Sequence, residues 1–283
     1  MKHTANKHSR RAFLQNSLGM VGAVAGTLMG APALARSLQQ ETRMREGLPS
    51  NGRTPRQTLG PFFPDDGDPV TDIRENLDFR LPISEANDND LTSIRGKDGK
   101  AKGQVVYIRG NVLKDVRGAL EPVPGAVLIE WNASASGRYN HRGDQGNVQF
   151  QHPLSGEWIE RSHDDHFQYW GRCITDAEGH YWFKTIVPGF YPVDVEAQWY
   201  RPPHLHFMIT APGVPQLVTQ LYFRGEHIQG NDFIQGLNAK DGILQSDRMT
   251  EEERESVIIE YANDPAGLIT DGLVGHYDFV LSL

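Results

Sequence analysis

From residue 103 onward, the chain consists of short apolar runs rich in β-branched and aromatic residues, separated by turns that contain glycine or proline. Runs of this kind between turn residues are typical of β-strands. No helical pattern lies between successive runs as far as Phe223, which disfavours a parallel sheet covered by helices and favours an all-β fold with a β-sandwich core. The predicted strands span residues 105–112, 125–131, 181–186, 204–210, 217–223 and 276–281.

One segment has the pattern of a helix, at 250–261 near the C-terminus. Thr250 can accept a hydrogen bond from the first turn, and Glu253 follows three residues later, which is the spacing of a capping box. We therefore predict a minor C-terminal helix beside the β-sandwich.

The region before residue 103 lacks this succession of apolar runs and turns. Residues 36–53 are polar and aperiodic, as in a linker, and 58–64 form a turn-rich piece with two adjacent aromatic residues. Aromatic residues in a loop indicate that the loop docks on another surface. We interpret 36–102 as an irregular N-terminal arm that places Phe62 and Phe63 on its own sandwich or on a neighbouring subunit. Because the arm has too few apolar residues for a core of its own, we expect a homo-oligomer or a hetero-oligomer.

Residues 1–35 have the features of an export signal. A basic start contains Arg10 and Arg11, a weakly apolar run follows over 18–29, and a small-x-small pattern ends at Ala35. A twin arginine before such a run is typical of the Tat route, and the run is too short to span a membrane. We therefore expect a protein that is exported to the periplasm or the extracellular space.

Replacement of Arg10 and Arg11 by lysine should leave the protein in the cytoplasm, because the Tat pathway reads the arginine pair. Fractionation followed by immunoblotting measures this, with the parent chain as the control. Export of the double variant at the parent level would contradict the assignment.

Charge and cysteine content exclude several classes of protein. The 283-residue chain has a formal charge of −8, which becomes −12 without the four basic residues of the signal. An acidic chain has no broad basic face for nucleic acid or anionic lipid, so we expect neither a nucleic-acid nor a membrane partner. Cys173 is the single cysteine, which excludes an intrachain disulfide and cysteine-based metal clusters.

The stretch from Tyr191 to His206 carries the densest set of candidate metal ligands. His204 and His206 begin an apolar run, and alternate residues of a strand point to the same side. The two imidazoles therefore face one point, where a metal ion fits. Pro202 and Pro203 cannot donate to a sheet, so the strand begins at His204.

Four other candidates have patterns that alone favour ordinary roles. Tyr139 follows a predicted strand in a loop of small residues, where a surface tyrosine is the commoner outcome. Tyr191 follows a Pro-Gly turn, as an aromatic residue at a core edge would, and Arg201 would usually be a solvated charge. Gln220 lies within a strongly apolar strand, and a buried amide must find hydrogen-bond partners. It therefore either bridges strands or faces a pocket.

His163 and His166, in a His-Asp-Asp-His sequence, offer a second possible metal cluster. They lie in a polar stretch over 143–167 without a strand or helix pattern, which favours a solvated loop. No partner spacing supports a ligand role for a further group of histidines: His141, His152, His180, His227 and His276.

Taken together, these motifs resemble those of intradiol ring-cleavage dioxygenases, most closely of the protocatechuate 3,4-dioxygenase type. The resemblance covers roughly residues 54–282 and depends on six stretches rather than on one motif. The stretches are Leu59-Gly60-Pro61-Phe62-Phe63-Pro64, Gly137-Arg138-Tyr139, Gly171-Arg172-Cys173, Phe183 to Pro192, Arg201 to Phe207 and Thr219 to Phe223.

The resemblance implies that residues 103–283 form a β-sandwich catalytic domain with a non-haem Fe(III) site. By resemblance, the ligands are Tyr139, Tyr191, His204 and His206. The family opens catechol-type rings, such as protocatechuate or a substituted catechol, between the two hydroxyl-bearing carbons. It uses O2 and releases cis,cis-muconate products.

The resemblance also implies individual roles. Tyr191 leaves the metal when the catechol arrives and takes one of its protons. Arg201 stabilises negative charge that develops on the ring, in a pocket from which water is excluded. Gln220 holds Arg201 or the edge of the substrate.

The residues alone leave two other functions open. One is a secreted zinc or copper protein that uses His204, His206 and another histidine. The other is a non-catalytic β-sandwich binding module in which Trp199 and Tyr200 contact a ligand. Metal analysis and colour separate the three, because zinc sites are colourless and a binding module holds no iron.

Overall fold

The computed structural model describes residues 52–64 and 86–282. Contacts divide the chain into two units, Met1–Glu46 and Gly47–Leu283, and the first lies outside the described residues. The predicted signal falls in that unit, so its role in export stays a prediction.

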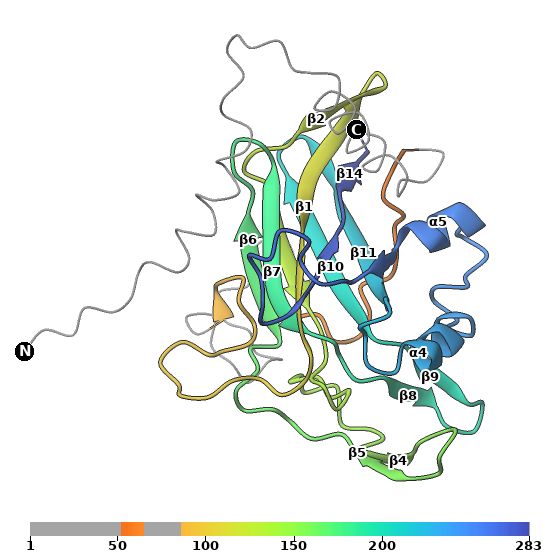
Figure 1. Ribbon diagram of the computed structural model, residues 1–283. Helices are drawn as coiled ribbons and strands as arrows, with labels where there is room; N and C mark the ends of the chain where they lie inside the picture. The colour runs from red at the N-terminus through yellow and green to blue at the C-terminus, as the bar shows by residue number, and fades with distance from the viewer. Residues whose placement is uncertain (1–51, 65–85, 283) are drawn as a thin grey trace, which may run out of the picture. The chain divides into compact units, whose positions relative to one another are not determined.

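One sheet is built around the long first strand, β1 (Val105–Val116). Its first half pairs with β7 (His180–Ile186) on one side and with β13 (Leu273–His276) on the other. Its second half pairs with β2 (Ala119–Pro122) and β14 (Phe279–Leu281). The first half of β1 alternates between buried and half-buried residues, so one face of the strand points into the core. Figure 1 shows β1 beside β7 and β14 in this sheet.

The predicted strand over 276–281 is instead divided between β13 and β14. Between them the chain turns onto β1, where the Tyr277 N–H donates to the Arg109 carbonyl. The next residue of β1 is Gly110, and a Cβ at this position would collide with the Tyr277 carbonyl. The close approach of the two backbones therefore requires glycine.

The other large sheet carries the candidate site. Its strands are β3 (Val127–Trp131), β6 (Trp170–Ile174), β10 (His204–Ala211), β11 (Val214–Arg224) and β12 (Ile258–Glu260). They lie side by side in the order β12-β11-β10-β3-β6. Strand β10 is central and its first six residues are all buried, so its two faces pack into two different environments.

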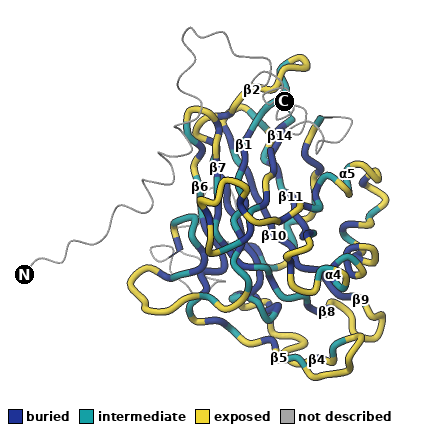
Figure 2. The backbone as a smooth tube through the Cα atoms, in the orientation of Figure 1, coloured by how far each residue is buried: buried dark blue, intermediate teal, exposed yellow. Residues whose placement is uncertain are grey.

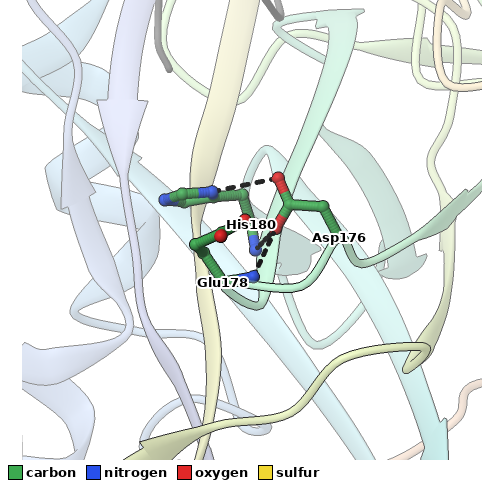
Figure 3. Close-up of side chains that lie close together, drawn as sticks. All are labelled: Asp176, Glu178 and His180. Carbon is green, nitrogen blue, oxygen red and sulfur yellow. Dashed lines mark hydrogen bonds and ion pairs between the residues drawn. The ribbon is translucent and has the colours of Figure 1, made fainter. Parts of the chain in front are cut away.

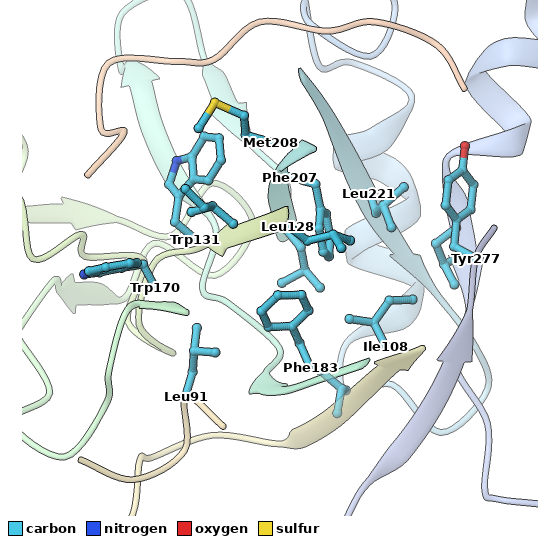
Figure 4. Packing of buried hydrophobic residues seen from close by; sticks show 14 of the residues in the cluster. Leu91, Ile108, Leu128, Trp131, Trp170, Phe183, Phe207, Met208, Leu221 and Tyr277 are labelled. Carbon is cyan, nitrogen blue, oxygen red and sulfur yellow. The ribbon is translucent and has the colours of Figure 1, made fainter. Parts of the chain in front are cut away.

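The inner face of this sheet packs on the first sheet and forms the sandwich core. Phe207, Leu128 and Leu221 lie opposite Phe183 and Ile108 of the first sheet (Figure 4). Figure 2 shows that the strands carry most of the buried residues and that exposed residues gather in the connections. The prediction of an all-β sandwich is confirmed.

The outer face of β10 is covered by the described part of the N-terminal arm. Trp131 of β3 lies on this face beside His206, and Phe63 packs edge-on against Trp131 with ring centroids 4.8 Å apart. The Gln57 N–H donates to the Val218 carbonyl of β11. The arm therefore docks on its own sandwich, which is one of the two arrangements predicted.

Two short hairpins and two short helices lie outside the large sheets. The hairpins pair β4 (Gln149–Gln151) with β5 (Trp158–Glu160) and β8 (Tyr191–Asp194) with β9 (Trp199–Arg201). The helices are α4 (Asn231–Asn238), which contacts β9 and β11, and α5 (Glu251–Ser256). Neither described helix is long and apolar enough to cross a membrane.

The C-terminal helix begins as predicted but is shorter. The Glu253 N–H donates to Thr250 Oγ1 at 3.1 Å, and the Thr250 N–H donates to Glu253 Oε2 at 2.8 Å, which completes the capping box. The helix ends at Ser256, because the following residues form β12 and pair with β11. The other helix, α4, was not predicted: it is short, contains Gly236 and follows Gly230, which as the N-cap residue has no side chain to cap it.

Most residues of the 143–167 stretch are exposed, as a solvated loop predicts, but the stretch is not without structure. It contains β4 and β5, and Phe150, Arg161 and Phe167 are buried. The polar composition of the stretch gave no sign that these three residues are buried by contacts with distant parts of the chain. His163 and His166 are both half-buried, with 45% of the His166 side chain accessible.

An acidic side chain lies inside the sandwich. Glu130 of β3 pairs with Phe207 of β10, whose side chain lies on the inner face, and Glu130 is completely buried. Neither carboxylate oxygen has a hydrogen-bond partner among the described residues. Burial raises the pKa of Glu130 well above its ordinary value, so the folded protein holds it protonated.

Glu130→Gln should make stability less sensitive to rising pH. The proton on Glu130 stabilises the folded state fully below the unfolded pKa of about 4.3, and this contribution is lost as pH rises towards the folded pKa. Between the two pKa values, the parent should lose about 1.4 kcal/mol of unfolding free energy per pH unit relative to the variant. Urea unfolding at several pH values measures this, with exposed Glu196→Gln as the control. Parallel pH profiles for the parent and Glu130→Gln would contradict a protonated core acid.

Candidate metal centre

Four side chains meet at one buried point beside the outer face of β10. The Nε2 atoms of His204 and His206 lie 3.1 Å apart, and Tyr139 Oη lies 3.4 Å from His204 Nε2. The Tyr191 ring stands edge-on to Tyr139 with centroids 5.8 Å apart, and the two phenol groups are hydrogen-bonded to each other. The structure therefore brings together all four residues that the sequence nominated as ligands.

The strand fixes the two imidazoles. His204 Nδ1 lies 2.6 Å from the Pro202 carbonyl, to which it donates its proton, so Nε2 presents a lone pair to the centre. The His206 ring stacks on Trp131 at 4.6 Å and an interplanar angle of 11°. Gly60 approaches the same ring: its φ of 76° is a left-handed conformation, and a Cβ there would lie 3.2 Å from His206 Cε1.

Tyr139 is held in its loop from both sides. Its N–H donates to Asp144 Oδ2 at 2.8 Å, and Arg161 Nη2 donates to the same oxygen at 2.7 Å. Arg161 also donates to the Gly137 carbonyl just before the tyrosine. The Phe62 ring lies 4.7 Å from the Tyr139 ring, and Tyr139 has no exposed surface.

Tyr191 enters from the hairpin β8–β9. It is the first residue of β8 and pairs with Arg201 of β9, so the two side chains leave the hairpin on the same face. The Arg161 guanidinium lies 5.2 Å from the centre of the Tyr191 ring. One buried arginine thus contacts the segments that supply both tyrosines.

The electrostatic environment suits a metal ion. Burial, and then the nearby charge of Arg201, lower the pKa of both His204 and His206 well below the ordinary value, so both imidazoles are neutral and can donate lone pairs. Burial raises the pKa of Tyr139 and Tyr191, so the phenols keep their protons unless a cation lies beside them. Two imidazoles and two phenols that converge in a dry site fit a cation that ionises the phenols on binding.

The candidate catalytic arginine is fixed in a buried network. Arg201 Nη2 donates to Gln220 Oε1 at 2.5 Å, and Arg201 Nε lies 3.0 Å from Asp241 Oδ1. Gln220 Nε2 in turn donates to the Thr58 carbonyl of the arm at 2.9 Å. Gln220 therefore bridges Arg201 and the docked arm, which accounts for an amide in an apolar strand.

Sequence reasoning missed several residues of this site: Asp144, Arg161, Tyr222 and Asp241. Each reaches its partner across long stretches of chain, and Asp241 lies in a polar segment that has the composition of a surface turn. The local sequence carries no signal for any of them.

Another cluster of potential ligands lies in the turn before β7. Asp176 Oδ2 lies 3.0 Å from His180 Nδ1, and Glu178 is close to both (Figure 3). The backbone N–H groups of Glu178 and His180 also donate to Asp176 Oδ1. These bonds close an Asp turn whose residues are mostly exposed, so the cluster is explained by the turn itself.

Comparison with known proteins identifies the family. A family model described as Dioxygenase matches residues 82–281. The chain is 36% identical over 171 residues to the protocatechuate 3,4-dioxygenase beta chain of Burkholderia cepacia, a match that covers 58% of this chain and 66% of that relative. The chain belongs to the intradiol ring-cleavage dioxygenase family. The resemblance that its motifs indicated is therefore confirmed.

Other relatives within the family act on different rings, by their names. The chain is 28% identical over 211 residues to catechol 1,2-dioxygenase 2 of Acinetobacter lwoffii, covering 71% of this chain and 61% of that one. It is 31% identical over 164 residues to 6-chlorohydroxyquinol 1,2-dioxygenase of Cupriavidus pinatubonensis, covering 52% and 51%. These matches span from about half to two thirds of the length of the three relatives.

His204→Ala should abolish metal binding, because no other described side chain can take the place of an imidazole fixed by its strand. His180→Ala, in the exposed turn of Figure 3, is the matched control and should keep the metal. Elemental analysis of both purified variants measures the difference. Retention of metal by His204→Ala together with its loss from His180→Ala would place the site in the turn instead.

Proposed function

We propose that this chain is a non-haem Fe(III) dioxygenase that cleaves catechol-type rings between the two hydroxyl-bearing carbons and gives cis,cis-muconate products. Tyr139, Tyr191, His204 and His206 would hold the iron. The observation that carries the proposal is the convergence of two phenols and two neutral imidazoles, whose Nε2 atoms lie 3.1 Å apart, at one buried point. Oxygen and imidazole donors of this kind suit ferric iron, and family membership supports the same set.

When bound, ferric iron supplies Lewis acidity, which makes phenol and catechol hydroxyls more acidic and lets an ionised catechol react with O2. The protein supplies the rest. Packing around Tyr139 leaves that ligand no room to move, whereas Tyr191 lies at the end of a two-stranded hairpin and is slightly exposed. Tyr191 is therefore the ligand that gives way to the substrate.

With iron bound, Tyr191 Oη would be the acceptor for a proton from a catechol hydroxyl. A phenolate that moves away from a cation into a buried environment is a strong base, because burial favours its neutral form. The proton thus stays within the pocket while the substrate becomes an anion. The overall reaction would add both atoms of O2 to the catechol, so that no other product is released.

Arg201 would face the charge that develops on the ring. Its Nε is paired with Asp241 and its Nη2 with Gln220, and no described residue bonds its Nη1. A guanidinium fixed on two edges presents the third without further reorganisation, which is what electrostatic stabilisation of a transient anion requires. Gln220 acts by holding Arg201.

The histidine-based zinc or copper site is disfavoured by a specific observation. Among the described residues, the groups of three or more histidine, cysteine or carboxylate ligands close enough to share a metal do not include His204 or His206. The other close donors are the two tyrosines, which zinc and copper sites rarely use in this number. A binding module would leave the four converging donors without a purpose.

Substrate and location are part of the same proposal. The named relatives act on protocatechuate, catechol and a chlorinated hydroxyquinol, so a substituted catechol is the proposed substrate and O2 the co-substrate. We also propose that the enzyme works outside the cytoplasm, because of the twin-arginine segment, and as a homo-oligomer or hetero-oligomer.

Tyr191→Phe should keep iron and part of the visible phenolate-to-iron absorption, bind catechol without O2 and turn over roughly a hundredfold more slowly or worse, because the proton acceptor is gone. Tyr139→Phe should change the absorption band both in the resting enzyme and in the catechol complex. Tyr181→Phe, a core tyrosine that donates to the Tyr277 carbonyl, is the matched control and should keep colour and rate.

Oxygen uptake with a panel of catechols, product analysis and absorption spectra measure these outcomes. Turnover of Tyr191→Phe at the parent rate would show that Tyr191 is not the exchanging ligand. A parent protein that holds zinc, or that consumes no O2 with any catechol, would contradict the proposed function.

A further inference from the structure

Asp241 is a fully buried carboxylate beside the candidate catalytic arginine. It follows α4, has no exposed surface, and its Oδ1 lies 3.0 Å from Arg201 Nε. The same side chain accepts from the Leu244 N–H at 3.2 Å, from Trp199 Nε1 at 3.3 Å and from the Tyr222 hydroxyl at 3.4 Å. It therefore connects the segment after α4 with β9 and β11.

The charge of Arg201 has no other close carboxylate partner among the described residues. Arg161, the nearby buried arginine, is matched by its own carboxylate, Asp144, at 2.7 Å. A buried guanidinium without a counter-charge is strongly disfavoured, so Asp241 is what permits Arg201 to be charged and buried at once.

The pair also sets the direction of the guanidinium. Asp241 Oδ1 lies 3.0 Å from Nε as the counter-charge, and Gln220 Oε1 accepts from Nη2, so the guanidinium is held between these two side chains. Among the described residues, Nη1 has no hydrogen-bond partner, and the Arg201 side chain leaves the hairpin β8–β9 on the same face as Tyr191.

We propose that Asp241 is a positioning residue that fixes the orientation of Arg201 for the ring-cleavage step. Its effect depends on the proposed function, because Arg201 has a catalytic role only if the chain cleaves catechols. Asp241 itself contacts neither the reacting ring nor the metal ligands; it acts through Arg201.

Asp241→Asn keeps the shape of the side chain and removes its charge. We expect kcat per bound iron to fall about tenfold to a hundredfold, since small misplacements of a catalytic group have effects of this size. The anaerobic dissociation constant for catechol should stay unchanged or fall, because the pocket becomes more positive while the iron ligands are untouched. A merely structural loss would instead weaken binding and turnover together.

Asp264→Asn is the matched control. Asp264 is also buried, lies 3.5 Å from Arg109 and accepts three backbone N–H groups, but it contacts no residue of the site. This variant should keep the parent kcat per iron. Equal losses in Asp241→Asn and Asp264→Asn would overturn the positioning role.

The decisive measurement is a double-mutant cycle with Arg201→Gln. If Asp241 acts through Arg201, adding Asp241→Asn to Arg201→Gln should lower kcat less than about twofold further. Additive losses, or no loss in Asp241→Asn alone, would overturn the proposal. If Asp241→Asn does not fold, Asp241→Ser takes its place in the cycle, because serine can still accept from the Leu244 N–H.

Failure of the proposed function gives a different result. A parent protein that consumes no O2 with any catechol contradicts the dioxygenase activity. In that case the melting temperatures of the parent, the two single variants and the double variant are compared instead of kcat. Non-additive changes would still show that Asp241 and Arg201 act as one unit, whereas additive changes would overturn the coupling itself.

Discussion

The site depends on one constraint, which is that β10 is buried on both faces. Its inner face carries Leu205, Phe207 and Ile209 into the sandwich core, so the register and direction of the strand are set by hydrophobic packing. A shift of one residue would place the imidazoles in the core and the phenylalanine in the site. The packing of the sandwich thus fixes where His204 and His206 point before any metal is present.

The outer face of β10 needs a cover, and the cover supplies the rest of the site. Gly60 and Phe62 of the arm lie over His206 and Tyr139, and the loop before β4 and the first residue of β8 supply the two tyrosines. Because this cover excludes water, the imidazoles stay neutral and the phenols stay protonated until a cation arrives. The N-terminal arm is therefore part of the site, although its own sequence contributes none of the four donors.

Two buried ion pairs hold the elements that a β-sandwich does not fix. Arg161 and Asp144 join the loop of Tyr139 to the segment before β6, and Arg201 and Asp241 join β9 to the segment after α4. Buried pairs add little net stability, since the cost of removing two charges from water offsets much of their attraction. Their directional bonds instead select one arrangement of loops that would otherwise have several.

The sequence allowed the strands and the facing imidazoles to be predicted, because both follow from a period of two along a single strand. Tyr139 was nominated as a ligand only by resemblance, whereas Tyr191 also lies in the stretch with the two histidines, and Gln220 was nominated both as an amide in need of partners and by resemblance. The two ion pairs were not foreseen: Asp144 lies 17 residues before Arg161, and Asp241 lies far along the chain from Arg201. Such contacts arise from tertiary packing and produce no periodic pattern in the sequence.

The two tyrosines differ in how their backbones are held, and this difference supports the separate roles proposed for them. The Tyr139 backbone N–H is bonded to Asp144, which Arg161 fixes in turn, and Phe62 covers the ring. Tyr191 belongs to a two-stranded hairpin that shifts register between Pro192 and Asp194, and its ring lies against Tyr139 and the Arg161 guanidinium. A short, irregular hairpin deforms more easily than a loop tied by a buried ion pair. This difference in backbone restraint supports the proposal that Tyr191 is the ligand that gives way to the substrate.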